Sequence, residues 1–105
     1  MKTELQKIAD SFIQLMKDFI QKNISGPYFK KQYFALWQPF IHHQDYLEIP
    51  EKPRLAINHV FVSVDAYCSD PALRGQYSID EDQLREEVKT ELLKIKPELE
   101  KEFSN

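Results

Sequence analysis

The chain has 105 residues, of which 42% are apolar and 30% charged, and this balance is typical of one globular domain spanning residues 1–105. It contains only two glycines and one cysteine, which argues against an all-β fold and rules out an internal disulfide. The sequence shows neither a secretory signal nor a run of about 20 apolar residues that would cross a membrane. We therefore expect a soluble, cytoplasmic protein.

The charge is divided unevenly along the chain, although the total is only −3. Residues 1–44 carry six basic and three acidic side chains, whereas residues 45–105 carry eight basic and fourteen acidic ones. An acidic surface repels nucleic-acid phosphates, so we expect no direct binding of nucleic acid. The same surface suits a basic protein partner.

The first half of the chain predicts two amphipathic helices. Apolar residues spaced by three, four or one predict a helix over residues 3–23, and a second stripe predicts another over 27–43. Gly26 is a natural stop for the first helix, and Ser25 is a candidate N-cap for the second. Pro39 removes a backbone donor, so we expect the second helix to be kinked or split there.

The third predicted helix covers residues 53–69, with Pro53 opening it and its apolar face formed by Ile57, Val60, Phe61, Val64 and Cys68. Val60, Val62 and Val64 also alternate, so a strand is an open alternative. Helix is favoured because the flanking pattern is long and lacks hairpin signals.

A loop is expected over 70–79, followed by a fourth helix between Asp80 and Pro97. Asp80 and Gln83 have the spacing of a capping box. Four amphipathic helices with mostly short connections predict an all-α, antiparallel four-helix bundle, with Phe12 and Phe61 in its core.

Metal binding is not expected. His42 and His43 are adjacent, so on a helix their side chains point about 100° apart and do not converge with Asp45 on one ion. The acidic run 80–82 lacks the glycine and the later glutamate of a calcium loop.

Enzymatic activity is not expected either. Cys68 is a lone cysteine without a local base, and a small buried cysteine is the commoner role. His59 and Ser63 share a helix face, but no glycine elbow accompanies them. No cofactor motif or small-molecule site is apparent.

The most informative segment is 64–91. From residue 65 to residue 91 it holds eight acids and three bases, interleaved with Tyr67 and Tyr77. Acids over 80–82 are equally well explained as partners of a helix dipole. That explanation does not cover Asp65 and Asp70, which lie near the opposite end of another helix. Tyrosine beside clustered charge is typical of a binding hot spot, although Tyr67 could equally be a core residue.

The runs D-A-Y-C-x-D-P-x-L-R at residues 65–74 and x-I-D-E-x-x-L-R-x-x-V at 78–88 resemble the colicin D-type immunity proteins, a family that includes immunity proteins of contact-dependent growth inhibition systems. The run I-S-G-x-x-F at 24–29 is also similar, so the resemblance spans nearly the whole chain. The chain departs from the family pattern in the linker 44–52 and in the tail after Pro97.

The resemblance implies a four-helix antiparallel bundle that neutralises the C-terminal nuclease domain of a bacterial toxin, often one that cleaves tRNA. The carboxylates would stand in the basic cleft where RNA phosphates lie. The candidate toxin-binding residues are Asp65, Tyr67, Asp70, Tyr77, Asp80, Glu81, Asp82 and Glu86. Arg74 and Asp65 are alternatively internal structural residues, and an adaptor for a basic partner unrelated to a toxin is the alternative function.

Overall fold

The structure, a computed structural model, describes residues 3–68, 70–73, 75 and 78–103. Its four long helices are α1 (Glu4–Ile20), α2 (Gly26–Ile41), α3 (Glu51–Ala66) and α4 (Glu81–Ile95). Short helical turns are η1 (Tyr46–Glu48), η2 (Pro71–Leu73) and η3 (Pro97–Leu99), and the chain ends in α5 (Glu100–Phe103). The predicted all-α class is confirmed.

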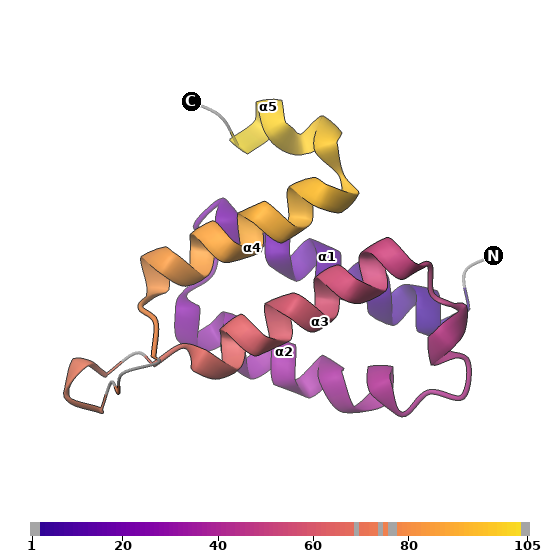
Figure 1. The fold of residues 1–105 in the computed structure, drawn as a ribbon, viewed down its shortest axis with the longest axis horizontal. Helices are drawn as coiled ribbons and strands as arrows, with labels where there is room; N and C mark the ends of the chain where they lie inside the picture. The colour runs from indigo at the N-terminus through magenta and orange to yellow at the C-terminus, as the bar shows by residue number, and fades with distance from the viewer. Residues whose placement is uncertain (1–2, 69, 74, 76–77, 104–105) are drawn as a thin grey trace.

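The four long helices run alternately up and down and form a ring (Figure 1). Helix α1 packs against α2 and α4, and α3 packs against α4 and α2, so α2 and α4 face each other diagonally. After α4 the chain turns back, and Lys89 Nζ donates to the carbonyl of Phe103 at 3.4 Å. This arrangement is the predicted four-helix bundle, with α5 as an added turn beside α4.

Two helix caps form where the sequence predicted them. The Ser25 hydroxyl accepts a hydrogen bond from the Tyr28 amide at the start of α2. The Asp80 carboxylate accepts one from the Gln83 amide, at 2.8 Å, at the start of α4. Each cap satisfies a backbone donor that the helix itself leaves free.

The second and third helices differ in detail from the prediction. Of the two outcomes expected at Pro39, a kink or a split, the split is wrong, because α2 continues through Pro39 as one element. Pro39 lies in the last turn and Ala35, one turn earlier, is exposed, so water can replace the lost backbone bond. Helix α3 begins at Glu51, before Pro53, and ends at Ala66. The residues Val60, Val62 and Val64 are therefore helical, and the strand alternative is wrong.

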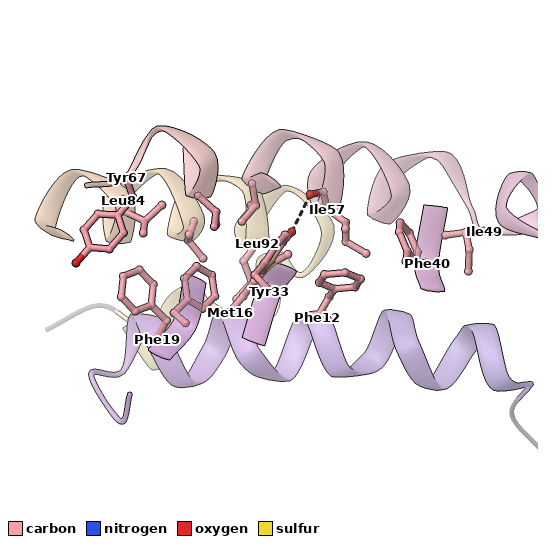
Figure 2. Close-up of a cluster of buried hydrophobic side chains, with 14 of the residues drawn as sticks. Phe12, Met16, Phe19, Tyr33, Phe40, Ile49, Ile57, Tyr67, Leu84 and Leu92 are labelled. Carbon is pink, nitrogen blue, oxygen red and sulfur yellow. Dashed lines mark hydrogen bonds between the residues drawn. The ribbon is translucent and has the colours of Figure 1, made fainter. Parts of the chain in front are cut away.

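The core is a column of aromatic rings along the seam between α1 and α2. Phe19 stacks on Phe29 with ring centroids 4.3 Å apart, and Phe29 contacts Tyr33 at 5.4 Å. Phe12 lies against Tyr33 at 4.7 Å and against Phe40 at 5.1 Å. Figure 2 shows this column extending from Phe19 to Phe40. Smaller side chains of α3 and α4 cover it, namely Ala56, Ile57, Val60, Val64, Leu84, Val88 and Leu92.

Phe61 does not belong to this fully buried core, contrary to the prediction. It lies half-buried between α2 and α3, where it stacks on Trp37 with centroids 3.9 Å apart and contacts Phe34 at 5.5 Å. The buried stripe of α3 consists of Ala56, Ile57, Val60 and Val64, and Phe61 lies at the edge of that stripe.

The different depths of two phenylalanines lead to a stability prediction. Phe12→Ala removes a fully buried ring and is expected to lower the free energy of unfolding by about 3–5 kcal/mol. Phe61→Ala leaves a site that water can enter, and roughly half that loss is expected. Urea unfolding of the two variants measures both values, and equal losses would contradict the placement of Phe61.

Tyr33 joins α2 to α3 through a buried hydrogen bond. Its hydroxyl donates to the backbone carbonyl of Ile57 at 2.7 Å, and the side chain is fully buried (Figure 2). Burial raises the pKa of Tyr33 well above its usual value, and the nearby charge of Glu91 raises it further.

This raised pKa predicts a specific loss of stability in alkali. The unfolded chain releases the Tyr33 proton near pH 10, whereas the folded chain keeps it to higher pH. The stabilisation is therefore complete below about pH 10 and declines as the pH rises toward the folded-state pKa. Tyr33→Phe should lower stability by about 1 kcal/mol at neutral pH through the lost hydrogen bond. Urea unfolding at neutral and alkaline pH should show a weaker alkaline decline in the variant than in the native chain.

Candidate functional site

The predicted acidic segment lies at one end of the bundle, where α3 ends and α4 begins. The connection between these helices projects from the bundle beyond both of them (Figure 1). Its two ends are held together because the Cys68 amide donates to the Ile79 carbonyl at 3.2 Å and the Ile79 amide donates to the Ala66 carbonyl at 3.0 Å. These bonds place Asp65, at the end of α3, near Asp80, at the start of α4.

Five of the predicted contact residues expose their carboxylates at this end of the bundle. Asp82, for example, has 95% of its side chain exposed. The Asp70 carboxylate accepts a hydrogen bond from the Ala72 amide at 2.9 Å, which orders the start of the connection. We call the following exposed residues the acidic face: Asp65, Asp70, Asp80, Asp82 and Glu86.

A shallow groove of about 330 Å³ continues from the acidic face between α3 and α4. Glu86, Glu87 and Glu91 line it from α4, and His59 lines it from α3. His59 Nδ1 lies 3.3 Å from a Glu91 oxygen, and Lys94 Nζ lies 3.0 Å from the other. The groove is therefore acidic mainly at its Glu86 and Glu87 end, next to the acidic face.

Glu81, also predicted as a contact residue, has 39% of its side chain exposed, and both of its carboxylate oxygens have partners within the protein. One carboxylate oxygen accepts a hydrogen bond from the Gly26 amide at 2.6 Å. The other oxygen pairs with the Arg85 guanidinium at 3.1 Å. Gly26 is the first residue of α2, so the carboxylate also meets the positive end of that helix dipole.

Arg85 extends this contact to the end of α1. Its Nε donates to the carbonyl of Phe19 at 3.1 Å, and its guanidinium lies 4.7 Å from the centroid of the Phe19 ring. Only 13% of its side chain is exposed. Glu81 and Arg85 thus join the start of α4 to the junction of α1 and α2, and we call this pair with Gly26 and Phe19 the α4 clamp.

Tyr67 is a core residue in this structure, with 4% of its surface exposed. Its hydroxyl lies beside Gly26, and its backbone carbonyl accepts a hydrogen bond from Lys30 Nζ at 2.7 Å. This placement agrees with the alternative reading of Tyr67 as a packing residue. Tyr77 and Arg74 lie outside the described residues.

Sequence reasoning did not find Gly26, Lys30 and Arg85 as partners of the acidic segment. The spacing of four between Glu81 and Arg85 is the signal that favours an ion pair on one helix. The contact between Gly26 and Glu81 joins residues 55 positions apart, and no local pattern predicts it.

In the described part of the chain, no group of three or more histidine, cysteine, aspartate or glutamate side chains has the geometry of a metal site. His43 Nδ1 accepts a hydrogen bond from the Asp45 amide at 3.1 Å, so this ring orders the end of α2. The Ser63 hydroxyl faces the backbone carbonyl of His59 and not its ring. Among the described helices, none is both long enough and apolar enough to span a membrane.

Residues 7–95 match a family model described as bacterial self-protective colicin-like immunity. The match covers most of the chain, so this protein belongs to that family, and the resemblance seen in the sequence is confirmed. No curated protein matches the chain. Membership of this family implies that the protein neutralises a bacterial toxin by binding it.

The close approach at Gly26 predicts that this position tolerates no side chain. A methyl group there would meet the Glu81 carboxylate and the Tyr67 hydroxyl. Gly26→Ala is therefore expected to cost about 1–3 kcal/mol, as the clamp and the buried ring must shift. Gly75→Ala is the control, because a Cβ added there would have none of the described atoms within 4 Å, and the change in stability should stay within about 0.5 kcal/mol. Thermal and urea unfolding compare the two, and similar effects would argue against the close packing at Gly26.

Proposed function

We propose that this immunity protein binds the C-terminal nuclease domain of its cognate toxin, a tRNase, and blocks the RNA-binding cleft with the acidic face. The toxin would be one delivered by contact between bacteria, and the protection would operate in the cytoplasm, where tRNA is found. The observation that carries this proposal is the gathering of five exposed carboxylates at one end of a rigid bundle.

The charge of a nuclease cleft makes this end of the bundle the suitable one. A protein that binds RNA holds the phosphates with lysine and arginine side chains. Carboxylates such as those of Asp65 and Asp82 can occupy the same positions, and their mutual repulsion is relieved when the cationic cleft surrounds them. The basic half of the chain, residues 1–44, lacks this complementarity.

The direct test is co-expression with the nuclease domain of the cognate toxin. Cells producing both proteins should survive, and the two should copurify. An inactive nuclease domain bound to labelled tRNA should release the tRNA when the immunity protein is added. Copurification without tRNA release would contradict blockage of the cleft and would indicate binding at a remote site.

Neutralising part of the acidic face should slow association with the toxin domain. The triple variant Asp65→Asn, Asp82→Asn, Glu86→Gln removes three charges and spares Asp80, whose cap is needed by α4. We expect the association rate at low salt to fall by about tenfold or more, with a weaker dependence on salt, because long-range attraction speeds encounter. Stopped-flow fluorescence over a range of salt concentrations measures both effects.

A matched control changes the net charge equally outside the acidic face. Glu48, Glu98 and Glu100 are exposed and lie in η1, η3 and α5, so none of them belongs to the start of α4. Replacing all three by glutamine should change the association rate much less. If the two triple variants associated equally slowly, net charge and not the acidic face would govern the encounter.

A further inference from the structure

We propose that Glu81 is a positioning residue, which holds the acidic face in place through Gly26 and does not itself contact the toxin. This inference rests on the proposed function, because it concerns how the same face is presented. In this proposal, neighbouring carboxylates of the acidic run 80–82 have different roles.

The charge of Glu81 is already paired within the protein, although 39% of its side chain is exposed. One oxygen bonds the Gly26 amide and the other pairs with Arg85. The carboxylate also lies at the N-terminus of α2 and in the first turn of α4, where two helix dipoles favour a negative charge. Asp82, one residue later, has 95% of its side chain exposed and has only a 3.4 Å contact to Arg85. Asp82 is therefore the more available of the two carboxylates for a partner.

The Glu81 contact is also the tie that crosses the bundle. Helices α2 and α4 are diagonal in the ring, and the bond from Glu81 to Gly26 joins their starts directly. Lys30, one turn further along α2, holds the backbone carbonyl of Tyr67 at the opposite end of the connection between α3 and α4. The first two turns of α2 thus form hydrogen bonds with both ends of the segment that carries Asp70 and Asp80. If these hydrogen bonds are lost, the charges remain but are no longer held in one arrangement. More conformational entropy is then lost when the toxin binds.

Two pairs of substitutions separate geometry from charge. Glu81→Gln keeps an oxygen that can accept the Gly26 amide and removes the charge. Glu81→Asp keeps the charge, but a side chain one methylene shorter cannot reach Gly26. Asp82→Asn and Asp82→Glu are the matched controls, since the first removes an exposed charge and the second keeps it. The probe is the inactive nuclease domain of the cognate toxin, and its association and dissociation rates are measured with the full-length protein.

At position 81 the charge-keeping substitution should have the larger effect on binding, and at position 82 the charge-removing one should. Glu81→Gln should change both rates by less than about twofold, whereas Glu81→Asp should raise the dissociation rate by about tenfold, as expected for lost preorganisation. Asp82→Asn should slow association by about threefold at low salt, whereas Asp82→Glu should not. In the free protein, amide hydrogen exchange at Gly26 should be faster in Glu81→Asp than in Glu81→Gln. Thermal unfolding shows that each variant is folded at the temperature of the binding measurement.

The failures of the two proposals are distinguishable. If Glu81→Gln slowed association as Asp82→Asn does, while Glu81→Asp bound normally, Glu81 would be a charge contact and the positioning role would be wrong. If Glu81→Asp freed the Gly26 amide without changing the dissociation rate, the clamp would serve stability alone. If the native chain did not bind the nuclease domain, the proposed function itself would fail, whatever the Gly26 amide showed.

Discussion

The aromatic column between α1 and α2 is the constraint on which the rest of the bundle depends. Five large rings fill this seam, so α3 and α4 can approach it only with smaller side chains such as Val60 and Val88. The column ends at Phe19, where α1 stops, and Arg85 packs on that ring and bonds the Phe19 carbonyl. The hydrophobic core therefore sets where α4 begins, and through α4 it sets where the exposed carboxylates stand.

The sequence predicted the helices well because their signals are local. Apolar spacing identified all four, and Ser25 and Asp80 marked the starts of α2 and α4 through hydrogen bonds that span three residues. Depth of burial was less predictable, because it depends on neighbours distant in sequence. Periodicity placed Phe61 on an inner face, but the structure shows that it is only half-buried and stacks on Trp37 of α2. Pro39 was tolerated for a similarly contextual reason, its position in an exposed last turn.

In the candidate site too, features set by neighbouring residues were predictable, and features set by residues distant in sequence were not. Composition identified the acidic segment, but it treated Glu81 and Asp82 as equivalent. On a helix adjacent side chains point about 100° apart, so one turns toward the bundle and the other toward solvent. The apolar stripe of α4, formed by Leu84, Val88 and Leu92, extends back to Glu81 and turns that residue inward. Gly26, 55 residues away, has no side chain and so leaves room for the carboxylate. The tyrosines were ambiguous in the same way, and the space beside Gly26 made Tyr67 a packing residue.

Some carboxylates at this end of the bundle are bonded within the protein and others are exposed, and this separation suits an immunity protein. Exposed charges such as Asp65, Asp82 and Glu86 have few internal contacts, so replacing them costs the fold little. The clamp residues Gly26, Glu81 and Arg85 are joined to each other and to the core, so each constrains the others. In the proposed function, the acidic face could be altered toward a new toxin while the scaffold stays intact. Electrostatic attraction at that face would then set how fast the partners meet, and the order imposed by the clamp would set how much entropy binding costs.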